Sequence, residues 1–313
     1  MAEKGRKSFL ESGETAMKRR TESAGGRRKR EAFFAYLMIA PLMAGVLLFY
    51  IGAFFKNLYY GFTDKGSFGD AELIGIKNYM EIAKDGAFLR AAANTALYAL
   101  FCVPAVLLLS VLLALLLNVR LKGIGLLRVC IFLPAVTLPS AIGLIWRWMM
   151  NYEFGLFNEI RALFSLKRIA WLSDPNYALF SVSLVFIWAN VAYPVIILLA
   201  GLQSIPSCYR EAAQIDGAGR WRQFTSITLP IFFVLITTVI NVLQIFDFIY
   251  LMIPEGSIGM ASARSLVSYF FRQSFVMGHR GYGAAVSVIL FLLILLVTML
   301  LMFLQKRIVF YDD

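Results

Sequence analysis

The chain has 313 residues, of which 60% are hydrophobic and only 16% are charged. So large an apolar share cannot pack inside one water-soluble core, which excludes a soluble globular protein and indicates an integral membrane protein. The net charge of +11 raises nucleic acid as a partner, but ten basic residues lie in the tail Met1 to Arg30, where a positive-inside anchor that touches anionic lipid explains them, so no nucleic-acid partner is expected.

In chain order, residues 1–31 are predicted to be a basic, disordered cytoplasmic tail, because they are polar and lack an apolar period. Six uncharged runs follow, and each approaches or exceeds the roughly 20 residues that a spanning helix needs. Their continuous apolar character predicts helices, since lipid cannot satisfy open backbone groups. The predicted fold is an all-α membrane protein with a transmembrane domain over 32–308, a tail at 309–313, and six spans at about 32–55, 91–119, 129–150, 176–202, 229–253 and 281–305.

Two amphipathic segments are expected between the spans. The stretch "LIGIKNYMEIA" follows the first span, and "FGLFNEIRALFSL" covers Phe154 to Leu166. The spacing of their apolar residues predicts short helices that lie on the membrane surface or pack against the spans.

The distribution of basic residues predicts the orientation. Eighteen lie in the N-terminal tail, the loops after the second and fourth spans and the C-terminus; the loops on the opposite side carry eleven, balanced there by nine acidic residues. The positive-inside rule therefore places both termini in the cytoplasm. The first apolar run is 24 residues long and follows 30 polar residues, so it is expected to be a retained helix and not a cleaved signal peptide.

Residues with catalytic or metal-binding potential are few. The chain has one histidine, no CxxC, no phosphate-binding loop, no HExxH and no carboxylate pair inside the spans. No catalytic residue, metal site or ATP hydrolysis on this chain is predicted. His279 is interpreted as an ordinary surface residue, and the three cysteines, on the cytoplasmic side or in spans, indicate no disulfide.

The run "REAAQIDGAGRWRQFTSITLP" interrupts two apolar segments and falls in a predicted cytoplasmic loop at 203–228. Its pattern predicts a short helix from Tyr209 to Asp216 that two glycines end. Composition alone leaves two interpretations open: a solvated turn, or a docking knob whose small residues let another surface approach the backbone. The residues of the knob would be Glu211, Ala212, Ala213, Asp216, Gly217, Gly219 and Arg220.

The order of these residues resembles a known signature. Glu-Ala-Ala, three residues, glycine, nine residues and then Ile227, Leu229 and Pro230 are similar to the EAA motif of permease subunits of binding-protein-dependent ABC importers. The segments "NTALYAL", "LLALLLN", "FLPAVTLPSAIGLIWRWMMNYEFGLFN" and "FDFIYLM" extend the resemblance over roughly residues 30–308, to the carbohydrate-uptake branch and its six-helix permease of sugar and glycerol-3-phosphate importers. The chain departs from that branch after the fifth helix, where "IPEGSIGM" replaces the usual "GGP".

The resemblance implies the type I importer permease architecture and a multi-pass place in a bacterial or archaeal inner membrane. It implies that the loop forms the coupling helix that fits a cleft of a cytoplasmic ATPase. The implied partners are a second permease, two ATPase subunits, an external solute-binding protein and a sugar-class solute. ATP and Mg²⁺ would bind the ATPase subunits, so this chain needs no cofactor and is not itself an enzyme.

Depth along the helices, at about 1.5 Å of rise per residue, indicates which residues face a solute path. The candidates are polar or aromatic residues near mid-membrane or toward the outer mouth: Ser140, Trp188, Asn190, Tyr193, Asn241, Gln244 and Asp247. Amide and hydroxyl groups suit sugar hydroxyls because they offer donors and acceptors, and Pro194 removes the donor that would otherwise bond the Asn190 carbonyl. For the two aromatic residues the alternative is packing or lipid contact, and for Asp247 it is an interfacial carboxylate.

Two other functions stay open at this point. An ABC permease for a peptide, phosphate or metal ion should carry cations or thiols in mid-span, and none clusters there. A non-transporting membrane scaffold or sensor should lack an intact joint for an ATPase.

Overall fold

The computed structural model describes residues 31–118, 123–204 and 228–308, and every regular element in these ranges is helical. The chain divides into two units, Met1–Tyr59 and Tyr60–Asp313. The first unit contains a 30-residue apolar helix that begins at Glu31; it is π-helical over Val46–Gly52 (η1) and α-helical again over Ala53–Tyr60 (α2). At about 1.5 Å per residue this helix is long enough to cross a bilayer.

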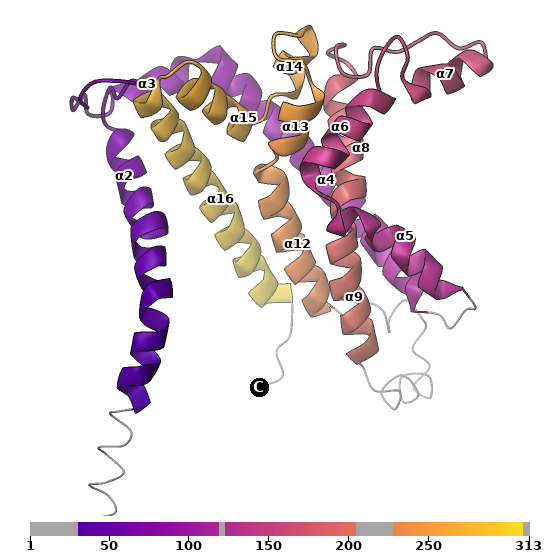
Figure 1. Ribbon diagram of the computed structural model, residues 1–313, viewed down its shortest axis with the longest axis horizontal. Coiled ribbons are helices and arrows are strands. Elements are labelled where there is room, and N and C mark those ends of the chain that lie inside the picture. The colour runs from indigo at the N-terminus through magenta and orange to yellow at the C-terminus, as the bar shows by residue number, and fades with distance from the viewer. Residues whose placement is uncertain (1–30, 119–122, 205–227, 309–313) are drawn as a thin grey trace, which may run out of the picture. The chain divides into compact units, whose positions relative to one another are not determined.

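The second unit is a bundle of long apolar helices joined by short ones (Figure 1). In chain order the elements are α3 (Lys77–Lys84), α4 (Gly86–Leu117), α5 (Ile124–Val136), α6 (Pro139–Met149), α7 (Leu156–Leu163), α8 (Ala178–Asn190), α9 (Ala192–Ser204), α12 (Thr228–Leu243), α13 (Asp247–Met252), α14 (Ile258–Ala263), α15 (Leu266–Phe271), η2 (Arg272–Val276) and α16 (Arg280–Ile308). The two predicted amphipathic segments form α3 and α7.

The short helices α3, α7, α14 and α15 gather at one end of the second unit, which we call the short-helix end (Figure 1). Helices α9, α12 and α16 extend away from it. The division follows from composition, because α4 and α16 carry long uncharged runs whereas α3 and α7 alternate apolar and charged residues. The charged side chains of the short helices need water, and the long helices need an apolar environment.

Only some of the predicted spans are uninterrupted helices. Glu31–Tyr60, Gly86–Leu117 and Arg280–Arg307 are long and apolar enough to cross a membrane without a break. The predicted span 129–150 is instead the pair α5 and α6, bent by 102°, and 176–202 is the pair α8 and α9, bent by 40°. The predicted span 229–253 ends its long helix at Leu243 and resumes at Asp247.

Helix α4 is the central support of the second unit. Its side chains Tyr98, Cys102 and Val106 are fully buried, and the helix packs against α8, α9 and α12. Near its start three polar side chains bond to the backbone of the segment that joins α14 to α15. The Asn94 amide donates to the carbonyls of Ala261 and Arg264, both at 3.1 Å, the Tyr98 hydroxyl donates to the Ala263 carbonyl at 2.9 Å, and the Thr95 hydroxyl accepts from the Leu266 amide at 2.9 Å. These bonds position a loop of the short-helix end.

A second polar network links α4 to the helices that follow α14. The Asp85 carboxylate caps α4 by accepting from the Ala87 amide at 2.8 Å, and its other oxygen accepts from the hydroxyls of Tyr269 and Tyr282. The Gln273 amide donates to the Tyr269 hydroxyl at 2.8 Å. Partial burial pushes the pKa of Asp85 upward, but the hydrogen bonds from Tyr269, Ala87 and Tyr282 outweigh it, so the pKa is lowered.

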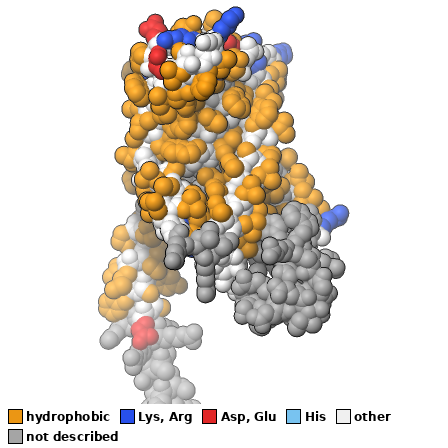
Figure 2. Space-filling view, turned by 90° about the vertical axis from the view of Figure 1, so that its right-hand side faces the viewer, with side chains coloured by type: hydrophobic (Ala, Val, Ile, Leu, Met, Phe, Trp, Pro, Cys, Tyr) orange, Lys and Arg blue, Asp and Glu red, His pale blue; other side chains and the backbone are white. Residues whose placement is uncertain are grey.

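The outer surface of the long helices is apolar. Leucines on α4 and α16, such as Leu108, Leu112 and Leu296, are 61% to 66% exposed. Figure 2 shows apolar side chains over most of this face, with most of its lysine, arginine, aspartate and glutamate side chains at the short-helix end and a few near the opposite end. A surface of this kind is stable in lipid and not in water.

Candidate functional site

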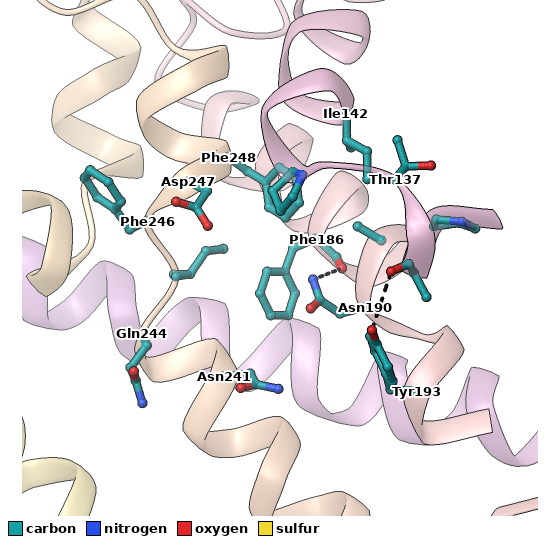
Figure 3. A pocket seen from close by; sticks show the side chains of 15 residues that line it. Thr137, Ile142, Phe186, Asn190, Tyr193, Asn241, Gln244, Phe246, Asp247 and Phe248 are labelled. Atoms are coloured by element: carbon teal, nitrogen blue, oxygen red, sulfur yellow. Dashed lines mark hydrogen bonds between the residues drawn. The ribbon is translucent and has the colours of Figure 1, made fainter. Parts of the chain in front are cut away.

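A cavity of about 430 Å³ lies inside the second unit, where α5, α6, α8, α12 and α13 meet (Figure 3). Its fifteen lining residues include a single charged side chain, Asp247. The lining is Pro134, Ala135, Thr137, Pro139, Ile142, Phe186, Ala189, Asn190, Tyr193, Asn241, Gln244, Ile245, Phe246, Asp247 and Phe248.

The cavity lies where three helical pairs are interrupted. Helix α5 ends before Thr137, α8 ends at Asn190, and α12 ends before Gln244, and all three of these residues line the cavity. Irregular backbone at membrane depth is tolerated only where it is buried in protein or lines a hydrated space. All three breaks border the cavity, in agreement with this rule.

Two prolines leave backbone acceptors at these breaks. Pro139 and Pro194 have no N–H group, so the carbonyls of Ala135 and Asn190, four residues earlier, lack their usual helical donor. The Tyr193 hydroxyl donates to the Ala135 carbonyl at 3.5 Å (Figure 3). A solute hydroxyl in the cavity meets main-chain acceptors as well as side chains.

Polar side chains enter the cavity from different helices. The Asn190 amide nitrogen donates to the Phe186 carbonyl at 2.9 Å, which fixes its side chain and leaves its amide oxygen toward the cavity (Figure 3). Asn241, Gln244 and Asp247 are exposed while their neighbours Val242, Ile245 and Phe248 are buried. Exposed amides and a carboxylate are costly against lipid, so this face belongs to an aqueous path or to a partner protein.

The cavity brings together five of the seven residues that the sequence suggested for a solute path: Asn190, Tyr193, Asn241, Gln244 and Asp247. It does not include Ser140, which is exposed at the start of α6. The depth estimate for Ser140 assumed one straight helix, and the 102° bend between α5 and α6 removes its basis. Trp188 packs edge-to-face against Trp146, with ring centroids 5.5 Å apart, as in the packing alternative.

Gln244 and Asp247 reach the cavity by a different route from the one expected. A continuous helix would place Asn241, Gln244 and Asp247 on one face at three-residue spacing. The helix in fact ends at Leu243, and Asp247 begins α13 after an irregular Phe246 with φ −144° and ψ −54°. The carboxylate of Asp247 thus sits in the first turn of a helix, where the helix dipole favours negative charge.

Most of the chain matches one known protein family. The family of binding-protein-dependent transport system inner membrane components matches residues 79–310. The chain belongs to this family. It is thus a multi-pass inner membrane protein and the permease subunit of a binding-protein-dependent transporter, as the EAA-like sequence implied.

Several relatives cover most of this permease. It is 34% identical to the trehalose/maltose transport system permease protein MalF of Thermococcus litoralis, over 85% of this chain and 91% of that one. It is 35% identical to the sulfoquinovosyl glycerol transport system permease protein SmoG of Agrobacterium fabrum, over 73% and 75%. It is 32% identical to the multiple sugar-binding transport system permease protein MsmF of Streptococcus mutans, over 86% and 94%.

A solved structure shares the fold of this permease. A chain of a bacterial ABC transporter involved in the import of the acidic polysaccharide alginate superposes with a TM-score of 0.77 at 22% identity, over 90% of this chain and 98% of that one. The described part of the chain therefore has the overall fold of that transporter chain.

Sequence reasoning missed ten lining residues of the permease cavity. Most are apolar or aromatic, such as Phe186 and Phe248, and nothing in an apolar run distinguishes such a residue from one that faces lipid. Pro139 was the available signal, since the residue before a proline avoids helical geometry; Leu138 has ψ 132°. The predicted coupling residues from Glu211 to Arg220 lie outside the described residues.

Proposed function

We propose that this permease forms half of the translocation path for a sugar or a related polyol in an ATP-binding-cassette importer. The observation that carries the proposal is the cavity at the three helix breaks, because its amides, hydroxyl groups and main-chain carbonyls match the donors and acceptors of sugar hydroxyls. Its volume of about 430 Å³ falls in the range of small-molecule sites. Broken helices that meet at a polar site are typical of membrane transporters.

The names of three relatives support a sugar-class solute. They transport trehalose or maltose, sulfoquinovosyl glycerol, or multiple sugars by name. The lining agrees in chemistry, because it contains no lysine, arginine or cysteine. A permease for phosphate would need cations at this point, and one for soft metal ions would need thiols.

The proposed topology has six spans, at about 32–55, 91–119, 129–150, 176–202, 229–253 and 281–305, with a basic tail at 1–31 and both termini in the cytoplasm. The excess of basic residues in the tail and the loops after the second and fourth spans supports it. The short-helix end then faces the outside of the cell, and the coupling loop at 203–228 faces the cytoplasm.

The proposed assembly contains a second permease, two ATPase subunits that bind ATP and Mg²⁺, and an external solute-binding protein. Closure of the ATPase pair would move the coupling segment of each permease, Glu211 to Arg220 here, and switch the cavity between inward-open and outward-open states. The exposed face of Asn241, Gln244 and Asp247 would be closed by the second permease, so that the complete path lies between the two chains.

The cognate binding protein provides the direct test of the sugar class. Calorimetric titration with neutral sugars, polyols, peptides and inorganic phosphate should give saturable binding for a sugar or polyol alone. Binding of a peptide or phosphate instead would assign the permease to a different solute. A failure of the reconstituted complex to import any solute would favour the non-transporting scaffold.

A further inference from the structure

A second pocket, of about 260 Å³, lies at the short-helix end and shares no lining residue with the cavity. We call it the terminal pocket. It is formed by the end of α6, the loop after it, the segment before α8 and the second residue after α13. Its lining is Arg147, Met150, Asn151, Tyr152, Glu153, Ala170, Trp171, Leu172, Ser173 and Pro254.

Arg147 is the cation of the terminal pocket, and most of its hydrogen-bonding capacity is unused. Its side chain is exposed, and its single contact is a long hydrogen bond of 3.5 Å from Nη1 to the Leu251 carbonyl. Within the part of the chain that the structure describes, Arg147 forms no ion pair. A guanidinium presents five N–H donors in a planar fork that matches a carboxylate.

The walls of the terminal pocket are fixed by a buried amide. Asn158 is fully buried, and its Nδ2 donates to the carbonyls of Asn151, Tyr152 and Ile169 at 3.3, 3.1 and 2.9 Å. Its Oδ1 accepts from the Ile169 amide at 3.0 Å. The Asn151 side chain in turn accepts from the Glu153 amide at 2.8 Å. The pocket is therefore preorganised and does not need to be shaped by its occupant.

The terminal pocket is joined to the cavity by two helices that lie in close contact. A Cβ at Gly143 would lie 2.8 Å from the Leu251 Cβ, so α6 and α13 approach as closely as a glycine allows. At one end of this pair Ile142 and Phe248 line the cavity, and at the other end Arg147 and Pro254 line the terminal pocket. A displacement of α6 and α13 at the terminal pocket would therefore also move residues that line the cavity.

We propose that the terminal pocket receives a carboxylate side chain of the external solute-binding protein and that Arg147 pairs with it. The proposal rests on the proposed function, which places the short-helix end outside the cell. The pocket volume is below the range of small-molecule sites and fits one side chain, and arginine is enriched among the residues that dominate protein interfaces. Docking would then act on the cavity through α6 and α13.

The terminal pocket contains one positive and one negative side chain, Arg147 and Glu153. Glu153 lines the same pocket, so it repels an incoming carboxylate and would attract a lysine. The remaining nearby cation, Arg168, is already bonded to the carbonyls of Tyr152 and Glu153 and to the Glu159 carboxylate. Removing the charge of Arg147 and removing that of Glu153 must therefore act in opposite directions.

The test uses the complete complex in lipid nanodiscs, titrated with its sugar-loaded binding protein. For Arg147→Gln we expect the concentration that gives half-maximal stimulation of ATP hydrolysis to rise about tenfold, with the rate recovering at saturation and a weaker dependence on salt. Glu153→Gln should lower that concentration, because it removes the charge that repels the incoming carboxylate. Lys167→Gln is the matched control, because Lys167 is exposed on the same loop and lies outside the pocket.

Each other outcome overturns the proposal in a recognisable way. Wild-type docking by Arg147→Gln excludes a paired carboxylate, and a loss with Glu153→Gln indicates a cationic group of the partner. A lower maximal uptake by Arg147→Gln with unchanged docking would place the pocket on the sugar route instead. If the wild-type complex responds to no binding protein, the proposed function itself fails.

Discussion

Asn190 and Asn241 bring amide side chains to the cavity from two different helices. Asn190 is held by its bond to the Phe186 carbonyl, whereas Asn241 is exposed on α12. Because they approach from two sides of the same hollow (Figure 3), one solute can meet both. The two residues therefore offer a direct test of the path.

Replacing Asn190 or Asn241 by alanine should lower sugar uptake while the complex still assembles. A solute hydroxyl left without its partner costs on the order of 1 to 3 kcal/mol, or about 5- to 150-fold. Uptake into membrane vesicles at matched expression is the measurement. Ser140→Ala, outside the cavity, is the control and should transport normally. Unchanged uptake in both asparagine variants would show that the solute passes elsewhere.

Asp85 lies at the short-helix end, and we expect its replacement to lower the stability of the fold and not the binding of a solute. Asp85→Asn keeps a cap for α4 but removes the charge that accepts from Tyr269 and Tyr282, so we expect a loss of about 1 to 3 kcal/mol in unfolding free energy. The folded-state pKa of Asp85 is lowered from its ordinary value of 3.8. Its contribution is therefore complete above that value and is lost as the pH falls through the lower, folded-state pKa.

Thermal unfolding in detergent tests the Asp85 prediction. Asp85→Asn should melt at a lower temperature than the wild type near neutral pH, and the gap should narrow below about pH 4. A gap that stays constant into acid would mean that Asp85 contributes through its shape and not its charge.

At the residue scale, sequence reasoning found polar groups well and apolar ones poorly. Asn190, Asn241 and Gln244 were recognisable because an amide inside an apolar run needs a partner. Phe186 and Ile142 carry no such signal. Ser140 was placed by arithmetic that is valid only along a straight helix, and the 102° bend between α5 and α6 is a property of the element that the arithmetic did not include.

Helix breaks are the main element-scale feature that hydropathy could not supply. A window average over 129–150 is the same whether the helix is straight or bent by 102°, because hydropathy depends on which residues are present and not on their geometry. The short helices were easier to predict, since the alternating charges of α3 and α7 are local. The role of "NTALYAL" was also hidden: Asn94, Thr95 and Tyr98 bond to backbone groups more than 160 residues away in the chain.

The close contact between α6 and α13 predicts that a larger residue at Gly143 destabilises the fold. Gly143→Val should place a carbon against the Leu251 Cβ and force the helices apart, at a cost of about 1 to 3 kcal/mol. We expect lower thermal stability and lower uptake together. Gly125→Val is the matched control, because nothing lies within 4 Å of a Cβ at Gly125 on α5. Normal stability and uptake in Gly143→Val would contradict a rigid α6 and α13 pair.

At the scale of the whole molecule, family membership accounts for the general architecture, and the proposed coupling loop awaits its own test. The sequence supports that loop through the Glu-Ala-Ala and glycine spacing alone. Hydropathy could place the loop on the side of the basic tail, but it carries no information about the surface that the loop would meet. That information belongs to the partner ATPase.

Gly217→Val and Glu211→Lys should uncouple the proposed importer. A β-branched residue is strained where a helix end needs positive φ, and the second change reverses a charge offered to the ATPase. The binding protein should keep its sugar affinity, while stimulated ATP hydrolysis and uptake fall together. Glu81→Lys, exposed on α3 at the short-helix end, is the control. Wild-type stimulation in both loop variants would place the coupling element elsewhere.

The helix breaks around the cavity place main-chain carbonyls, such as those of Ala135 and Asn190, among the groups that a solute meets. Replacing the side chain of either residue leaves its carbonyl in place. We therefore expect part of the affinity for a polyhydroxylated solute to remain when these side chains change during evolution. Substitutions of side chains such as Asn241 would then change which sugar is preferred, while the main-chain contacts stay the same. We therefore expect new sugar specificities in this lineage to arise from promiscuous intermediates that still transport, and not through inactive ones.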